Sequence, residues 1–359
     1  MTPPVSRLLS CLALLICATG SAHAESMFQP PRTINIPGNA LRSFDIGYAQ
    51  DGVYALADRS NHGVDLIDTR TLQFLGRIPG FAGPVGAGQG GPNGVVMING
   101  TRLWAGDGGS LVRVADMRSR RIVATVATGG SKQVDELAYD PRDHLVIAAN
   151  NADDPPFLSF ISSRAPYRVR ARLRLPQATG GLEQPLWDPR TGMVYVAVPE
   201  LDGVAARGGI AVIDPRSARL TGVHDLARCM PGGLALGPGG KLLVGCSDDA
   251  VAAGFKAVSL LLDPVSGKIL RTFHQVGGSD EVWFDSASGD FMLAAVANPG
   301  GPVLGVIDAR RPHWVENIPS GRHAHSVAAD PGNGRAFVPV AAGDKTCPRG
   351  CVEVFKLKN

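Results

Sequence analysis

The sequence predicts an all-β protein in which small sheets form a closed ring, and two observations support this prediction. An apolar strand ending in a turn residue recurs seven times at spacings of 45 to 52 residues, close to the roughly 40–50 residues of a four-stranded blade. Glycine (45 residues) and proline (27 residues) are frequent, which favours short strands separated by turns. We therefore expect a seven-bladed β-propeller. Its seven turn residues are Asp68, Asp116, Ser162, Asp214, Asp263, Asp308 and Lys356.

The first 24 residues are expected to form a signal peptide. Arg7 supplies a basic start, residues 8–18 form an apolar run shorter than the ~20 residues that span a bilayer, and residues 22–24 (Ala-His-Ala) are a small-x-small cleavage signal. A membrane-retained helix is the alternative. No second apolar stretch of spanning length follows, so we expect a chain without a membrane span, located in the periplasm or secreted. The mature part, 25–359, would be a single propeller domain.

The unit 183–229 shows how each blade is built. Its first strand ends at a turn (188–192), residues 193–198 form an apolar second strand, and residues 209–213 form a third before Asp214. An aspartate that opens a turn accepts hydrogen bonds from backbone N–H groups two residues on, which explains why it recurs. The predicted blades are 44–81, 94–130, 134–179, 183–229, 232–278, 280–322 and 325–359.

The last unit has only three strands. Residues Thr33 to Ile36 can supply its missing outer strand and close the ring, so that no long sheet edge stays open. An open array is the alternative, and it would leave this N-terminal strand without a partner.

Cysteine usage favours an oxidising compartment. Two of the six cysteines lie in the leader, which leaves an even number in the mature chain. Cys347 and Cys351 can close a hairpin loop, because three intervening residues with Gly and Pro can bring the two Cα atoms within about 4.4–6.8 Å. Cys229 and Cys246 then pair by elimination. We expect both bridges to be structural, with a redox or metal role as the alternative.

Acidic residues and histidines gather where several inner strands begin. In a propeller these strands line a central channel, and their first residues lie at its mouth. Alignment by turns predicts one ring of equivalent positions: Ser43, Pro92, Asp135, Glu183, Gly232, Asp280 and His325. The next predicted ring is Phe44, Asn93, Glu136, Gln184, Gly233, Glu281 and Ser326.

The acidic pattern predicts a ligand site at the channel mouth. Two copies of one hexad (135–140 and 280–285) place an Asp-Glu pair on nearly opposite blades, and His323 and His325 would point to one side of a strand. Such oxygen and nitrogen ligands suit Ca²⁺, Mg²⁺, Mn²⁺ or Zn²⁺. Alternatively, the acids order loops or pair with Arg42 and Arg322. The loops 58–62 and 150–154 are weaker candidates on the same face.

The chain resembles the YVTN-type seven-bladed β-propellers of exported bacterial proteins. The resemblance is carried by residues 193–198 (MVYVAV), 210–215 (IAVIDP) and 335–340 (RAFVPV), with weaker copies across the mature chain. It implies the fold and export. That family includes binding proteins, accessory proteins of periplasmic redox systems and enzymes.

We therefore expect an exported propeller that binds a small molecule, a metal ion or a periplasmic protein at the channel mouth. The alternative is a metal-dependent lactonase, hydrolase or lyase, since the mouth is similar to that of gluconolactonase-type six-bladed propellers, which use a divalent ion to polarise a carbonyl and activate water. Under that alternative the ligands and base would be Glu136, Glu183, Asp280, Glu281 and His325.

Other functions are disfavoured by composition and motifs. Basic (35) and acidic (32) residues nearly balance, which does not indicate a nucleic-acid surface. The sequence lacks a Cys-x-x-Cys-His haem attachment and a nucleophile elbow. The glycine-rich run 86–91 is not followed by a helix pattern, so we expect no nucleotide cofactor.

Overall fold

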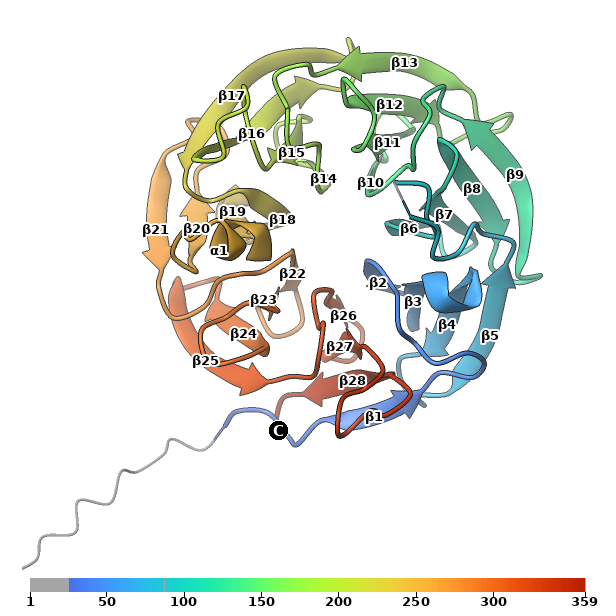
Figure 1. The fold of residues 1–359 in the computed structure, drawn as a ribbon, viewed down its shortest axis with the longest axis vertical. Coiled ribbons are helices and arrows are strands. Elements are labelled where there is room, and N and C mark those ends of the chain that lie inside the picture. Colours follow the sequence, from blue (N-terminus) through green and yellow to red (C-terminus); the bar gives the residue numbers. More distant parts are fainter. Residues whose placement is uncertain (1–25, 87, 359) are drawn as a thin grey trace, which may run out of the picture.

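A computed structural model describes residues 26–86 and 88–358; the predicted signal peptide lies outside these residues. The described chain forms seven four-stranded antiparallel sheets that stand radially around a central axis (Figure 1). This confirms the predicted seven-bladed β-propeller. In six of the sheets, the strands follow one another in chain order from the channel to the rim, and in the seventh sheet the N-terminal strand is outermost.

The strands of blades one to four have the following bounds. Blade one comprises β2 (Gly47–Gln50), β3 (Val53–Asp58), β4 (Gly63–Asp68) and β5 (Phe74–Pro79), and blade two comprises β6 (Val95–Ile98), β7 (Arg102–Asp107), β8 (Leu111–Asp116) and β9 (Arg121–Ala127). Blade three comprises β10 (Leu137–Asp140), β11 (Leu145–Asn150), β12 (Phe157–Ser162) and β13 (Val169–Arg174), and blade four comprises β14 (Pro185–Trp187), β15 (Val194–Val198), β16 (Arg207–Asp214) and β17 (Arg219–Ala227).

The remaining blades follow the same plan. Blade five comprises β18 (Pro231–Leu236), β19 (Leu242–Cys246), β20 (Ser259–Leu262) and β21 (Ile269–Phe273), and blade six comprises β22 (Glu281–Asp285), β23 (Asp290–Ala295), β24 (Val303–Asp308) and β25 (His313–Pro319). Blade seven comprises β26 (Ala328–Asp330), β27 (Arg335–Val340), β28 (Cys351–Lys356) and β1 (Arg32–Asn35). Short helices η1 (Arg59–Asn61), η2 (Pro238–Gly240) and α1 (Asp248–Ala252) lie in loops.

The N-terminal strand closes the ring as predicted. β1 pairs antiparallel with β28, with Thr33 opposite Glu353 and Ile34 opposite Val352. The observed strand begins and ends one residue earlier than the predicted one. In Figure 1, β1 (blue) lies beside β28 (red), so the two ends of the described chain meet in one blade.

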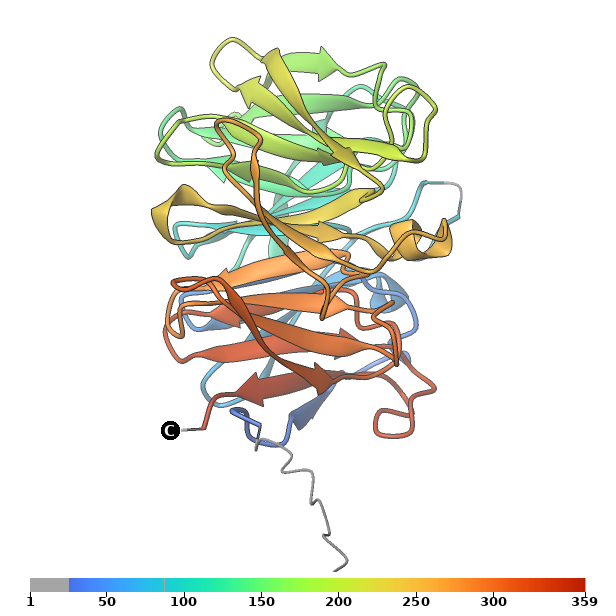
Figure 2. The ribbon, with the colours of Figure 1, turned by 90° about the vertical axis from the view of Figure 1, so that its left-hand side faces the viewer.

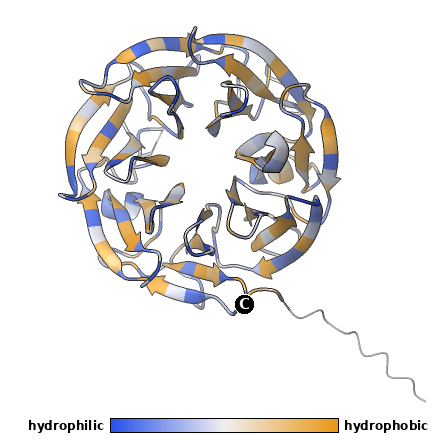
Figure 3. Ribbon diagram, turned by 180° about the vertical axis from the view of Figure 1, so that it is seen from behind, coloured by the Kyte–Doolittle hydropathy of each residue, from blue (hydrophilic) through white to orange (hydrophobic). Residues whose placement is uncertain are grey.

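The core lies between neighbouring blades. The second strands β3, β11 and β15 are buried almost throughout, whereas the outer strand β13 alternates between half-buried and exposed residues. Seen from behind, the outermost strands show this alternation as orange and blue bands (Figure 3). Exposure alternates along an outer strand because one of its faces packs on the next blade and the other faces solvent.

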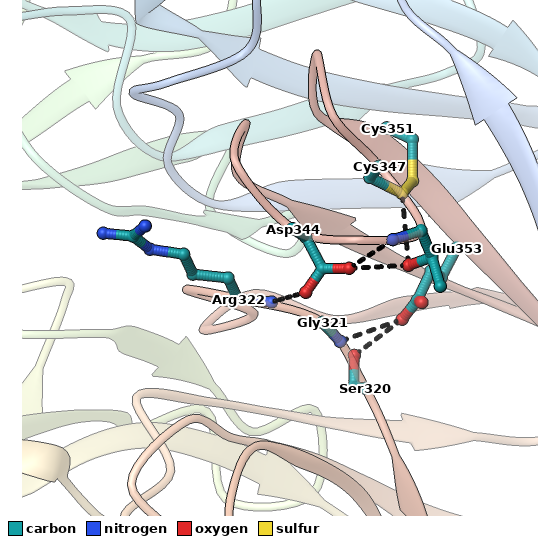
Figure 4. The surroundings of a disulfide bond; sticks show 8 residues. Ser320, Gly321, Arg322, Asp344, Cys347, Cys351 and Glu353 are labelled. Carbon is teal, nitrogen blue, oxygen red and sulfur yellow. Dashed lines mark hydrogen bonds between the residues drawn. A yellow bond between two sulfur atoms is a disulfide. The ribbon is translucent and has the colours of Figure 1, made fainter.

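Both predicted disulfides are present. Cys229–Cys246 joins the segment after β17 to the end of β19, and both residues are buried. Cys347–Cys351 closes the loop that enters β28 (Figure 4). Beside this bridge, the Asp344 carboxylate accepts a hydrogen bond from the backbone N–H of Arg322 (3.1 Å).

The edge-on view in Figure 2 shows the strands running between two loop-bearing faces, with α1 on one of them. Among the helices of the described chain, none has the length and apolar character needed to cross a membrane.

Candidate functional site

Four blades present a polar residue at one level of the channel mouth. Each of these residues lies two positions before its inner strand, and its backbone N–H donates to a carbonyl near the end of the second strand. The donor–acceptor pairs are Asp45 to Ala57 (2.9 Å), Asn93 to Gly106 (3.0 Å), Asp135 to Ala149 (2.8 Å) and Glu183 to Ala197 (3.0 Å). This repeated bond makes the four positions structurally equivalent.

The bond corrects the predicted ring in blades one and two. Asp45 stands where the turn alignment placed Ser43, and Asn93 stands where it placed Pro92. Ser43 is instead tied to the loop of η1, since its backbone N–H donates to Ser60 Oγ (2.8 Å) and its carbonyl accepts from the N–H of Ser60 (2.9 Å). Asp45 therefore lies at the channel mouth, although the alignment of the blades by their turns did not predict it.

Arg59 bridges blades one and two. Its guanidinium forms an ion pair with Asp45 and donates to Asn93 Oδ1 from Nε (2.9 Å). Arg59 begins η1, whose N-cap Asp58 accepts a hydrogen bond from the N–H of Asn61 (3.1 Å). Although burial opposes ionisation of Asp45, the charges of Arg59 and His325 lower the pKa of its carboxyl below its usual value. Asp45 is therefore a fixed negative charge.

His325 adds a second cation from blade seven. Its ring stacks on Phe44 with centroids 4.8 Å apart, and its Nδ1 donates to the carbonyl of His323 (2.8 Å). Its Nε2 lies 3.8 Å from Asp45 Oδ1. Burial disfavours the imidazolium, but the hydrogen bond to Asp45 and the charges of Asp280 and Asp45 prevail and raise the pKa of His325 to about 9.

His323 does not join the mouth as predicted. The expectation assumed that both histidines lie on one strand, but β26 begins only at Ala328. His323 is exposed in a turn with a left-handed backbone (φ 54°). The group of His323 that contacts the His325 ring is its backbone carbonyl.

Three acidic side chains at the mouth have no hydrogen bond or ion pair with any described residue: Glu136, Glu183 and Asp280. Glu136 is only 6% exposed. Burial, followed by the charges of Glu281 and Asp135, raises its pKa well above the usual value. Burial and the charges of Asp135 and Asp280 do the same for Glu183, and burial raises the pKa of Asp280 to about 6.

Asp135 and Glu281 are partly satisfied. Asn151 donates a hydrogen bond to the Asp135 carboxylate, whose pKa is nevertheless raised to about 8 by burial and by the charge of Asp45. Glu281 Oε2 accepts from Ser326 Oγ (2.6 Å) and from the N–H of Val327 (2.9 Å). Glu281 Oε1 is buried and has no hydrogen-bond partner in the described chain. Burial raises the pKa of Glu281 well above normal.

Two further acids come from α1, which the sequence reasoning did not single out. The charges of Asp248 and Asp249 contribute to the raised pKa of Asp280, and that of Asp249 to the raised pKa of Glu183. α1 follows the second strand of blade five, the same position in the blade as η1 and Asn151. This position directly after the second strand of a blade is the sequence signal that could have identified the acids of α1.

The mouth is thus strongly acidic. Eight carboxyl groups of the described chain contribute to these pKa shifts, together with the cationic side chains of Arg59 and His325. The eight are Asp45, Asp135, Glu136, Glu183, Asp248, Asp249, Asp280 and Glu281. Within residues 26–86 and 88–358, no three His, Cys, Asp or Glu side chains are grouped so that they could hold a metal ion. Among the predicted candidates, the acids and His325 interact electrostatically with one another, and Asn93 accepts a hydrogen bond from Arg59.

Comparisons with solved structures agree with the propeller fold. A chain of a mitotic checkpoint complex superposes with a TM-score of 0.68 at 14% identity, covering 99% of each chain. A chain of Kuenenia stuttgartiensis hydrazine synthase superposes with a TM-score of 0.65 at 12% identity, covering 86% of this chain and 96% of that one. No protein family and no curated protein matches the sequence. At these identities, the similarity shows a shared seven-bladed β-propeller fold and nothing more.

Proposed function

We propose that this propeller is a binding protein that receives a positively charged group of its ligand at the acidic channel mouth. The observation that supports this proposal is that the side chains of Glu136, Glu183 and Asp280 form no hydrogen bond and no ion pair within the described chain, although each is at least half-buried in an acidic setting. Buried carboxylates are costly unless they are paired. A cationic ligand would supply the missing partner.

An organic cation suits this arrangement better than a bare metal ion. The acids come from blades one, three, four and six and from α1, and no trio among the described residues is grouped closely enough to hold a metal. A polyamine, or a peptide that carries lysine or arginine, spreads its charges along a chain and can reach several separated carboxylates. Amines and guanidinium groups also donate several hydrogen bonds each.

We further infer that the chain is exported, as its resemblance to YVTN-type propellers implies. Two disulfides support this inference, because such bridges persist in oxidising compartments. The ligand would then be a periplasmic or extracellular small molecule or a basic segment of a protein.

Calorimetric titration of the mature chain tests the proposal, using spermidine, an arginine-containing tripeptide, Ca²⁺ and Zn²⁺ as separate ligands. We expect saturable binding of an organic cation at pH 8, weakened about tenfold in Glu136→Gln and Glu183→Gln. The matched control is Glu353→Gln, because Glu353 is also buried but is hydrogen-bonded to Ser320 and Gly321 away from the channel (Figure 4).

Two results would count against the proposal. If none of the organic cations gave a binding heat in the titration, the proposal would be wrong. Binding of Zn²⁺ or Ca²⁺ alone, lost in Glu136→Gln, would replace it with a metal site, and metal-dependent lactone hydrolysis would then be assayed on the same variants.

A further inference from the structure

Neighbouring blades are joined just below the channel mouth by a hydrogen bond that recurs in the described chain. The acceptor is the side chain of the residue that directly follows the mouth residue, and the donor is the backbone N–H two positions after the mouth position of the next blade. We call this contact the interblade hydrogen bond. Its donor and acceptor residues are Leu234 and Gln184, Val327 and Glu281 (2.9 Å), and Gly47 and Ser326 (2.8 Å).

Glu136 occupies the acceptor position of blade three, because it directly follows the mouth residue Asp135. The donor position of blade four is Pro185, which lies two positions after the mouth residue Glu183. Proline has no backbone N–H. The interblade hydrogen bond therefore cannot form between these two blades, and the Glu136 carboxyl has no hydrogen bond with any described residue.

The strand register shows that Pro185 stands at the donor position. Pro185 pairs with Val196, and Leu234 pairs with Val244. Both partners are the third residue of a second strand, β15 in blade four and β19 in blade five. Pro185 is thus equivalent to Leu234, whose N–H donates to Gln184. The absence of a donor for Glu136 follows from one residue type at one position.

Glu136 can be reached from the channel. Its side chain keeps a small exposed area, and neither of its carboxyl oxygens is completely buried, whereas Glu281 Oε1 is. The charges of Glu281, Glu183 and Asp280 act on Glu136, so its carboxyl faces acids of blades four and six. A buried carboxylate without a donor is costly, and a donor that enters through the channel would remove that cost.

The missing partner is an N–H donor, and this requirement distinguishes between kinds of organic cation. A primary ammonium group carries a full charge and three N–H donors on a narrow chain, so it can bond to Glu136 and also to a second acid such as Glu183. A quaternary ammonium group carries the same charge but has no N–H group. Charge alone attracts both cations, whereas the free acceptor favours the primary one.

We propose that Glu136 is the residue that selects a primary ammonium group of the ligand, and that Pro185 keeps the Glu136 carboxylate free for it. This inference rests on the proposed binding of a cation at the mouth and names the group that is bound. The ligand class is then a primary amine with a narrow chain, such as a polyamine or a lysine side chain.

The test compares two ligands of equal charge by calorimetric titration of the mature chain at pH 8. The first is 1,5-diaminopentane, and the second is the same chain with both nitrogens trimethylated. We expect the wild type to bind the diamine about tenfold more tightly, because only the diamine donates hydrogen bonds. Equal affinity for the two would overturn the inference while leaving cation binding in place.

Pro185→Ala restores a backbone N–H opposite Glu136 and removes no charge. The restored donor competes with the ligand, so diamine binding should weaken about fivefold and the preference over the trimethylated cation should shrink. Pro215→Ala is the matched control, since Pro215 is also a buried proline of blade four but lies in the turn between β16 and β17. It should bind both cations as the wild type does.

A readout without ligand tests the role of Pro185 separately. Carbon-13 NMR titration, with the Glu136 signal assigned by its loss in Glu136→Gln, should show a lower pKa of this carboxyl in Pro185→Ala than in the wild type, because a donated N–H favours the carboxylate. An unchanged pKa, or unchanged diamine affinity, in folded Pro185→Ala overturns the inference. If neither cation binds the wild type, the proposed function itself is wrong. Thermal unfolding shows whether each variant is folded, and the comparison of the two cations on the wild type stands without any variant.

Discussion

His325 Nε2 lies 3.8 Å from Asp45 Oδ1, and this contact joins the last blade to the first at the channel mouth. The two residues are 280 positions apart in the sequence and meet because the inner strands β2 and β26 of the first and last blades are neighbours in the ring. Phe44 stacks on the imidazole and Arg59 pairs with the same carboxylate. Ring closure and the electrostatics of the mouth are therefore linked.

This contact predicts that His325 stabilises the fold at low pH and not at high pH. Its pKa is about 9 in the folded protein against a reference of 6.5, so the folded state binds the proton more tightly. The stabilisation is complete below pH 6.5 and is lost as the pH rises through 9. Denaturant unfolding of His325→Asn should show a deficit of up to about 3 kcal/mol at pH 6.

At pH 10 that deficit should shrink to the part due to the lost ring stack on Phe44, which does not depend on pH. The carboxyl groups of Asp45, Asp280 and Glu281 interact with the imidazole, and Arg59 pairs with Asp45. A deficit that stays constant from pH 6 to pH 10 would show that the imidazole is neutral throughout.

Glu136→Gln should stabilise the protein while weakening ligand binding. The pKa of Glu136 is raised well above 4.5, so the folded state disfavours its ionised form. The side chain therefore lowers the free energy of unfolding more and more as the pH rises above 4.5. A neutral isostere removes that penalty. We expect the melting temperature to rise by about 2–4 °C at pH 8 and to stay unchanged at pH 4.

Gain of stability together with loss of binding is the signature of a residue kept for function. A drop in melting temperature at pH 8 would instead mean that Glu136 has a structural partner. Differential scanning calorimetry at the two pH values distinguishes the outcomes.

Arg59→Gln tests the sign of the ligand's charge. Removing the guanidinium makes the mouth more negative by one charge, so a cationic ligand should bind several-fold more tightly, whereas an anionic one would bind more weakly. Stability should fall by about 1–3 kcal/mol, because Asp45 and Asn93 lose their shared donor. Arg322→Gln is the matched control, since the Arg322 side chain is exposed and its backbone N–H, not its guanidinium, contacts Asp344.

The fold could be predicted because its signal is local and repeated. Each blade carries its own turn residue, and a blade boundary that is wrong by two residues does not change the number of sheets. A count of strands was likewise enough to predict that the last unit has three strands of its own and that Thr33 to Ile36 supplies the fourth. The disulfides followed from even cysteine number and short spacing.

The site could be predicted only in part, because equivalence between blades depends on register. Asp45 and Ser43 are two residues apart, and only the hydrogen bond from the N–H of Asp45 to Ala57 decides which one lies at the mouth. His323 was misplaced because the strand begins later than its sequence pattern indicated.

The cavity of about 530 Å³ that lies beside the inner strands of blades one to six could not be predicted at all. Tyr48, Tyr139, Trp187 and Trp283 each read as an ordinary apolar residue of an inner strand. Successive members of this set are 48 to 96 positions apart in the sequence, and the radial arrangement of the blades brings them together. Trp187 Nε1 is buried without a hydrogen-bond partner among the described residues, and this property of the folded chain cannot be predicted from the sequence either.

Closure by β1 should be essential for a soluble ring. Without residues 26–36, β28 would expose the backbone groups that now pair with β1, and open strand edges promote aggregation. Ile34 is 7% exposed and packs in the cluster that contains Phe44 and Phe337. Ile34→Ala should therefore cost about 2–4 kcal/mol of unfolding free energy. Thr33→Ala, an exposed neighbour in the same strand, should cost under about 1 kcal/mol.

Size-exclusion chromatography with light scattering should show oligomers for the chain that lacks residues 26–36 and a single species for Thr33→Ala. Because Asp45 contacts His325 across the same junction, the truncated chain should also bind a cationic ligand more weakly. A truncated chain that stays monodisperse, melts at the wild-type temperature and binds normally would show that the three remaining strands of blade seven close the ring without β1.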